Sequence, residues 1–345
     1  MTRLLLVPLT LLLSPILLAQ ADPPAAEEDS GPSFSGLELR GIGPAFMSGR
    51  ISDIAVDPAD ASTWYVAVGS GGVWKTTNRG TTWSPVFDGQ TSYSIGCVAV
   101  DANRPGTVWA GTGENVSGRH VGFGDGIYVS RDGGQSWAKK GLDASEHIGS
   151  IVVHPGDSNT LFVAAQGPLW SGGGERGVYK TTDGGESWTQ VLAAGPYTGA
   201  NEVVMDPSNP AVLYAAMHQR LRTVASLVNG GPESGIFKSI DGGDTWERLE
   251  GGLPKGNLGK IGLAVSSVDT SVVYATIEEA DRDGGFWRST DGGASWTKRS
   301  DYLSGGTGPH YYQEIFASIH DVDRVYQMDV RLHVTDAGGA NFRNM

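Results

Sequence analysis

Acidic, basic and aromatic side chains gather in the irregular segments between short apolar runs. Glu114 and Glu175 are the candidate catalytic carboxylates, because glycosidase chemistry needs two carboxyl groups roughly 5–10 Å apart. The pattern favours a structural role for both, as solvated or hydrogen-bonded loop acids. Residues whose hydrogen-bonding and stacking groups suit a ligand are Arg50, Asn115, Arg119, His120, His147, Trp170, Arg176, Tyr197, His218, Arg220, Glu278 and Tyr311.

The histidines do not form a metal-binding motif. They lie far apart in the chain, without an H-x-H or H-E-x-x-H pair, so neither a metal nor another cofactor is predicted. Cys97 is the single cysteine and lies in the apolar run Ile95 to Val100, which excludes an intrachain disulfide. A buried core thiol is therefore expected there, with a nucleophile as the alternative.

A short motif recurs six times and must position these side chains. Four copies have the pattern Asp-Gly-Gly-x-Ser/Thr-Trp and begin at Asp132, Asp183, Asp241 and Asp291. A divergent copy begins at Asn78, and another at Ala337. The spacing between copies runs from 46 to 58 residues, which is the length of one propeller blade.

Each repeat reads as four short strands. In the first, Ile51 to Val56, Trp64 to Val68 and Gly72 to Thr76 alternate apolar and polar residues between Gly, Pro, Asn and Asp. After the motif turn, Trp83 to Phe87 completes the unit. The sequence predicts an all-β propeller of about six blades over residues 36–345, with units 49–90, 94–142, 147–193, 200–250, 258–300 and 311–345.

Propeller connectivity separates the connecting segments into two faces. The box face holds the motif turns and the short turns between first and second strands; the loop face holds the irregular segments, including the candidate residues above. Asp and Gly-Gly suit a tight turn, and Trp suits the apolar layer between blades. A structural role, in preference to a Ca²⁺ loop, is therefore predicted for Asn78, Trp83, Asp132, Trp137, Asp183, Trp188, Asp241, Trp246, Asp291 and Trp296.

The motif resembles the Asp-box, or BNR, repeat S/T-x-D-x-G-x-S/T-W, from Gly49 to Phe342. The chain is similar to exported bacterial proteins described as sortilin-like or glycosyl-hydrolase-like, including xyloglucan-cleaving enzymes of family 74. That family implies a catalytic Asp before a Gly-Gly-aromatic stretch, where this chain has Gly69 or Ser70. Sialidases imply an aromatic-Arg-Ile-Pro string, where this chain has only Arg50-Ile51 followed by Ser52.

The N-terminus and the charge define the expected environment. Residues 1–21 are predicted to be a signal peptide, from Arg3, the apolar run Leu4 to Leu18 and Ala19-Gln20-Ala21. Residues 22–35 are predicted to be a flexible tether, and a secreted or periplasmic location follows. The formal net charge of −13 disfavours nucleic acid, and no run is long enough for a comfortable membrane span.

The sequence therefore predicts an exported scaffold that binds a glycan or protein ligand on its loop face. The alternatives are a glycoside hydrolase with carboxylates on that face, of sialidase or xyloglucanase type, and an assembly partner of another exported protein. The sixth unit is short, which leaves two possibilities for the ring. Either Gly36 to Ile42 supplies a closing strand, or the chain is the front part of a larger propeller; the oligomeric state stays open.

Overall fold

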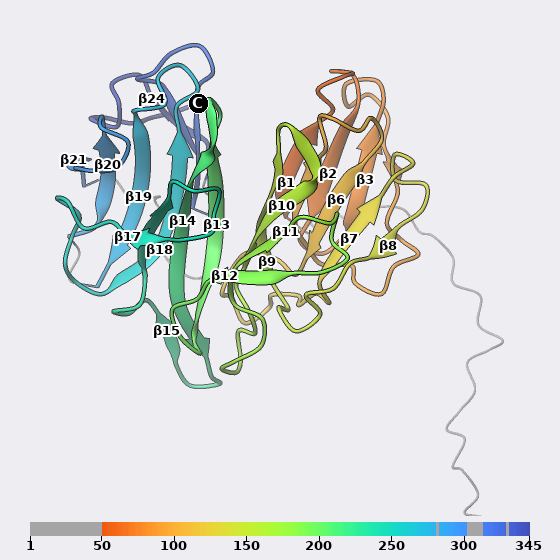
Figure 1. The fold of residues 1–345 in the computed structure, drawn as a ribbon, viewed down its shortest axis with the longest axis horizontal. Helices are drawn as coiled ribbons and strands as arrows, with labels where there is room; N and C mark the ends of the chain where they lie inside the picture. The colour runs from red at the N-terminus through yellow and green to blue at the C-terminus, as the bar shows by residue number, and fades with distance from the viewer. Residues whose placement is uncertain (1–49, 281–282, 302–312, 329–330) are drawn as a thin grey trace, which may run out of the picture. The chain divides into compact units, whose positions relative to one another are not determined.

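The computed structural model describes residues 50–280, 283–301, 313–328 and 331–345. These residues form an all-β propeller of six antiparallel sheets, and no helix occurs within them (Figure 1). The prediction of about six Asp-box blades is therefore confirmed. The predicted leader, the tether, the segment from Gly36 to Ile42 and Tyr311 lie outside the described residues.

Each blade contains four strands in chain order, from the axis outward. Blade 1 contains β1 (Ile51–Val56), β2 (Trp64–Val68), β3 (Gly72–Thr76) and β4 (Ser84–Pro85). Blade 2 contains β5 (Ile95–Val100), β6 (Val108–Thr112), β7 (Ile127–Ser130) and β8 (Ala138–Lys139). Blade 3 contains β9 (Ile148–His154), β10 (Asp157–Ala165), β11 (Gly177–Thr181) and β12 (Thr189–Leu192).

The last three blades repeat this order with one addition. Blade 4 contains β13 (Thr198–Asp206), β14 (Asn209–Arg222), β16 (Gly235–Ser239) and β17 (Glu247–Arg248), and β15 (Leu227–Asn229) pairs with β14. Blade 5 contains β18 (Leu258–Val265), β19 (Val273–Glu279), β20 (Gly285–Ser289) and β21 (Thr297–Ser300). Blade 6 contains β22 (Glu314–Ala317), β23 (Val325–Met328), β24 (His333–Thr335) and β25 (Arg343–Asn344).

The first three strands of blade 1 end where the sequence predicts, whereas β14 does not. His218 and Arg220 were expected to lie in an irregular segment of the loop face, but β14 continues to Arg222 and forms a hairpin with β15. The strand continues because its end has a pairing partner in β15: Arg220 pairs with Asn229, and Arg222 pairs with Leu227. This hairpin carries Arg220 and Arg222 beyond the body of the blade on the loop face.

Apolar layers between successive blades hold the fold together. One layer joins each pair of neighbours from blade 1 to blade 6, around residues such as Tyr65, Trp109 and Tyr214. Among the described residues no comparable cluster joins blade 6 to blade 1, where Ile54 is 52% and Phe316 is 48% exposed. The packing energy is therefore concentrated in five interfaces.

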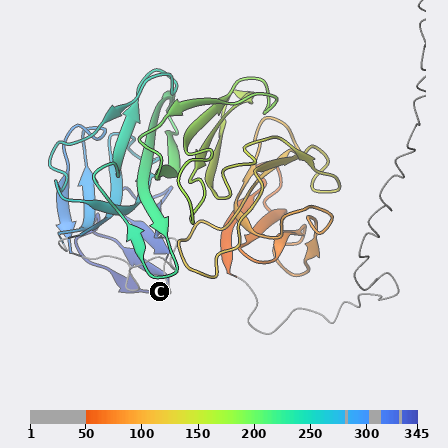
Figure 2. The same cartoon turned by 90° about the horizontal axis from the view of Figure 1, so that it is seen from below.

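The innermost strands β1, β5, β9, β13, β18 and β22 contact one another in succession around the axis (Figure 2). Each runs from the loop face toward the box face. The loops that precede these strands, and those that join second to third strands, therefore meet around one end of the axis.

Candidate functional site on the loop face

The loop that follows β6 crosses the end of the axis and is bound by several blades. Glu114 accepts from Arg50 Nε and Nη2, both at 2.5 Å, and its carboxylate is fully buried. The backbone oxygen of Asn115 accepts from Lys260 Nζ of blade 5 at 2.9 Å. Gln166 of blade 3 donates to the Asn115 side chain. The loop therefore ties blades 1, 3 and 5 together.

Two arginines of the β14 hairpin attach the same loop to blade 4. Arg220, which is 1% exposed, donates to the backbone oxygens of Val116 at 3.2 Å and Gly167 at 3.1 Å. Arg222 donates to the backbone oxygen of Ser117 at 3.0 Å. Buried carbonyl groups need such donors, so these guanidinium groups stabilise the loop.

Arg176 organises the corresponding loop of blade 3. It is buried and donates to the backbone oxygens of Gly173 at 2.7 Å, Gln166 at 2.8 Å and Ser171 at 2.6 Å. One planar group with five donors can satisfy several carbonyls of a single loop. Its contacts in this structure lie within its own loop.

The structure divides the predicted ligand-binding residues into two groups by accessibility. The buried group consists of Asn115, His147, Arg176, His218 and Arg220. The accessible or half-buried group consists of Arg50, Arg119, His120, Trp170, Tyr197 and Glu278. A ligand approaching the loop face meets the second group first, so the binding role predicted for the first group needs rearrangement of the loops.

The buried histidines are held in the neutral form. Burial, and next the Arg220 guanidinium, hold the pKa of His147 well below its ordinary value, and the pKa of His218 is lowered to about 3 by the same two causes. His147 Nδ1 lies 3.0 Å from the backbone oxygen of Glu114. Within the described ranges no group of three or more His, Cys, Asp or Glu side chains is placed to hold a metal ion.

Two half-buried glutamates lie at the junction between blades 2 and 3. Glu175 Oε2 accepts from the backbone N–H of Ala144 at 2.9 Å. Glu146 follows two residues later in that loop, with φ at +61°, an unusual value for a residue with a side chain. Burial raises the pKa of Glu146, although Arg176 and Arg220 act in the opposite direction. A carboxyl group with a raised pKa is suited to proton donation; the sequence analysis did not select Glu146.

Exposed aromatic side chains flank two contacts between loops. Tyr93 and Phe123 are 64% and 69% exposed, and the neighbouring Ser94 donates to the backbone oxygen of Gly122 at 2.8 Å. Trp170 and Tyr197 are 45% and 40% exposed. Their loops are joined by the hydrogen bond from Gly173 N to Pro196 O at 2.7 Å. Tyr93 and Phe123 were missed because only the fold brings their loops together.

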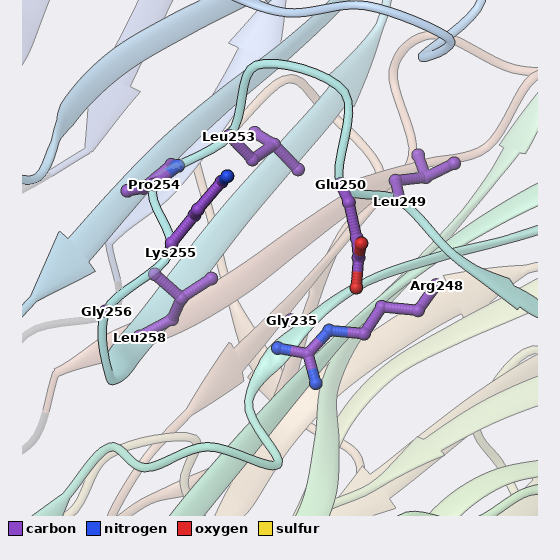
Figure 3. A pocket seen from close by; sticks show the side chains of 9 residues that line it. All are labelled: Gly235, Arg248, Leu249, Glu250, Leu253, Pro254, Lys255, Gly256 and Leu258. Atoms are coloured by element: carbon purple, nitrogen blue, oxygen red, sulfur yellow. The ribbon is translucent and has the colours of Figure 1, made fainter.

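A pocket of about 310 Å³ lies where β16, β17 and the segment before β18 meet (Figure 3). Leu253 and Leu258 give it apolar walls, whereas Arg248, Glu250 and Lys255 give it charged groups. The Glu250 side chain points toward Arg248 (Figure 3). Since β16 and β18 both begin at the loop face, this pocket belongs to that face.

The box face has a different construction. In the box of blade 2, Asp132 Oδ1 accepts from the backbone N–H of Ser136 at 2.9 Å and from Ser130 Oγ at 2.8 Å. The Ser136 and Ser130 hydroxyls and the Ser136 backbone lower the pKa of Asp132 to about 2. The Trp137 indole donates to Val86 O of blade 1 at 2.7 Å. The box thus closes its own turn and anchors the blade to its neighbour.

A family model described as "Sortilin, neurotensin receptor 3" matches residues 125–281. The six blades and the repeated boxes define an Asp-box β-propeller, and the match shows that its middle part is similar to the sortilin family.

Xyloglucanases are among the similar sequences. The xyloglucanase of a Paenibacillus species is 27% identical over 288 residues, which cover 81% of this chain and 24% of that protein. The chain thus spans about a quarter of the length of this relative.

Solved structures establish the same fold. The GH74 enzyme of Niastella koreensis superposes with a TM-score of 0.64 at 20% identity, over 84% of this chain and 46% of that one. YCF48 from Cyanidioschyzon merolae gives a TM-score of 0.55 at 17% identity, over 88% of this chain and 86% of that one. YCF48 has also been solved bound to D1 peptide.

Within the described residues no helix is long and apolar enough to span a membrane.

Proposed function

We propose that this chain recognises a xyloglucan-type β-glucan on its loop face, as the propeller portion of a glycoside hydrolase. The observation that carries the proposal is the exposure of Tyr93, Phe123, Trp170 and Tyr197 beside two contacts between loops. Exposed aromatic groups on a rigid scaffold are typical of a binding surface. The similarity to a xyloglucanase over 81% of this chain supports a glucan as the ligand. It also favours the hydrolase over the scaffold without activity.

The hydrolytic step needs one carboxylic acid and one carboxylate on either side of the glycosidic bond. Glu146 is suited to the acid, because burial raises its pKa. Glu175 lies at the same junction between blades and is suited to the second role. Glu114 is less suited, because its buried carboxylate already binds the Arg50 guanidinium.

Glucan binding is tested by calorimetric titration with xyloglucan oligosaccharides. Replacing Trp170 or Tyr197 with Ala should weaken binding by about fivefold, as expected when a stacking contact of roughly 1 kcal/mol is lost. Ile240→Ala is the matched control, because Ile240 is 72% exposed next to a box. Equal binding by all three variants would reject the loop face as the glucan site.

Hydrolysis is tested separately, by release of reducing ends from xyloglucan. The Glu146→Gln and Glu175→Gln variants should bind oligosaccharide as the parent does but lose at least 100-fold in rate, since each removes a proton-transfer group. Binding without hydrolysis by the parent chain would leave recognition standing and remove the catalytic part of the proposal.

Peptide recognition is the second candidate, because YCF48 matches this chain over nearly the whole length of both proteins and has been solved with a peptide. A pull-down from an exported-protein extract that recovers one stoichiometric protein, with no glucan binding in the titration, would favour it.

A further inference from the structure

Three carboxylates occupy equivalent positions on the innermost strands. The equivalence follows from the turn that ends each innermost strand. In four blades one backbone N–H of this turn donates to the carbonyl of the residue just before the second strand; these donors are Asp57, Asp101, Ser266 and Ser318. The residue four positions before this donor is equivalent in all six blades. From blade 1 to blade 6 it is Asp53, Cys97, Ser150, Glu202, Gly262 and Glu314. We call Asp53, Glu202 and Glu314 the acidic ring.

Hydrogen bonds from these positions join neighbouring blades. Asp53 Oδ2 accepts from Val98 N at 3.0 Å, and Glu202 Oε2 accepts from Leu263 N at 2.6 Å. Ser150 Oγ accepts from Val203 N at 2.9 Å in the same way. Asp53 and Glu202 are thus built into the scaffold, because their side chains join successive innermost strands.

A cavity of about 190 Å³ contains the acidic ring. Asn115, which comes from the loop that crosses the axis, lines it toward the loop face. Two residues beyond the ring, about 6–7 Å further along the strands, Val152, Val204 and Phe316 line it toward the box face. The cavity is therefore polar toward the loop face and apolar toward the box face.

Asn201 supplies an acceptor without a donor at this cavity. It lines the cavity and is 2% exposed. Its Nδ2 donates to Ile261 O at 2.7 Å, but its Oδ1 has no hydrogen-bond partner in the described part of the chain. A buried acceptor left unpaired costs free energy, so a ligand that donates hydrogen bonds would be stabilised here.

We propose that this cavity binds a primary ammonium group on an alkyl stem. The ammonium group has three donors for the acidic ring and Asn201 Oδ1, and its charge favours the ionised form of the ring acids. The stem packs against Val152, Val204 and Phe316. The volume equals that of about six waters at ~30 Å³ each, which accommodates a four- or five-carbon amine.

The charges around the cavity support a cation but disfavour a bare metal ion. Lys260 of β18 interacts with Glu314, Glu278 and Glu202, and also with the Arg220 guanidinium. With Asp53, the acids named here outnumber these two cations. Burial raises the pKa of Glu202 and Glu314 to about 8 and that of Asp53 to about 6. An alkylammonium group would ionise them and release protons. Among the described residues no three Asp, Glu, His or Cys side chains are placed to hold a metal ion, whereas the apolar walls suit an alkyl stem.

The first test is calorimetric titration with n-butylammonium, with n-butanol as the uncharged equivalent. The amine should bind, the alcohol should bind at least tenfold more weakly, and amine affinity should rise between pH 5 and pH 8 as the acidic ring ionises. Equal binding of amine and alcohol, or no binding of either, would overturn the proposal.

Variants locate the site and identify the source of the amine. Glu202→Gln and Glu314→Gln should each weaken butylammonium binding at least tenfold, whereas Glu247→Gln, on the exposed outer strand β17, should not change it. Val204→Trp should block the cavity while leaving the acids in place, and thermal melting checks that each variant folds. Unchanged binding by folded Val204→Trp would reject the cavity. The affinities of cadaverine and of a lysine-containing peptide are then measured, each with its acetylated form as the control. Tighter binding of cadaverine identifies a free diamine as the source of the ammonium group, and tighter binding of the peptide identifies a lysine side chain.

Discussion

The two faces of this propeller use polar residues in opposite ways. On the box face, Asp132 and its equivalents satisfy the N–H groups of their own turn and remain at the surface. On the loop face, Arg220 and Glu114 are buried and connect segments more than sixty residues apart. The repeated motif therefore forms local structure, whereas the irregular loops form the long-range connections.

This difference separates accessible from inaccessible candidates on the loop face. Arg176 and Arg220 satisfy buried carbonyls and Glu114 binds Arg50, whereas the side chains of Tyr93, Phe123, Trp170 and Tyr197 are exposed on the same face. The loop face therefore combines a rigid polar interior with an aromatic exterior, which is suited to a ligand with apolar ring faces.

Removing a long-range contact on the loop face should have the largest effect on the free energy of unfolding. Arg220→Ala should lower the free energy of unfolding by about 3–5 kcal/mol, because it leaves buried acceptors unpaired and opens a cavity. Urea unfolding followed by tryptophan fluorescence measures it. Arg119→Ala is the control, since Arg119 is exposed and makes one bond, to Val224 O at 3.0 Å. Equal losses in both variants would show that the buried network is not what stabilises this face.

A box glycine should have the next largest effect. A Cβ at Gly243 would lie 2.4 Å from the Phe162 ring, with φ at +82°, whereas Gly242 has φ at +74° and open space. Gly243→Ala should therefore cost about 2–3 kcal/mol, the sum of backbone strain and overpacking, and Gly242→Ala about 1 kcal/mol. Thermal melts of both proteins measure the difference. Similar melting temperatures would mean that the box turn moves away from blade 3 easily.

The two regions should respond to pH in opposite directions. The pKa of Glu202 is raised from 4.5 to about 8, so the unfolded chain loses this proton first and stability falls as the pH rises between these values. The pKa of Asp132 is lowered from 3.8 to about 2, so its contribution is present above pH 3.8 and is lost as the pH falls toward 2.

Urea midpoints measured from pH 2 to pH 9 test this contrast. Glu202→Gln should reduce the loss of stability between pH 5 and pH 8. Asp132→Asn should lower stability above pH 4 and reduce the further loss of stability between pH 4 and pH 2. An unchanged alkaline slope in Glu202→Gln would show that Glu202 is already ionised at pH 5.

The smallest effect on stability is expected at the aromatic exterior. Trp170→Ala should change the free energy of unfolding by no more than about 0.5 kcal/mol, because the Trp170 side chain is 45% exposed. Urea unfolding measures this change on the same sample used for glucan titration. A loss above 2 kcal/mol would place Trp170 with the structural network.

Strands and boxes are predictable because their signals are local. Alternation in Ile51–Val56 and the Gly-Gly of each box act within a few residues, so β1 to β3 end where the pattern predicts. The β14 hairpin was missed because His218 to Arg222 is polar, and its pairing with β15 depends on the carbonyls of another blade.

The sequence by itself determined the repeat, the β-propeller and the face on which the irregular loops lie. Only the tertiary structure decided which loop residues are accessible, because burial depends on contacts between segments far apart in the chain. Glu114 and Glu175 look alike in sequence, yet Glu114 is buried against Arg50 whereas Glu175 is half exposed. Likewise, the acidic ring contains three residues from three blades, and no local sequence pattern predicts that they lie close together at the axis.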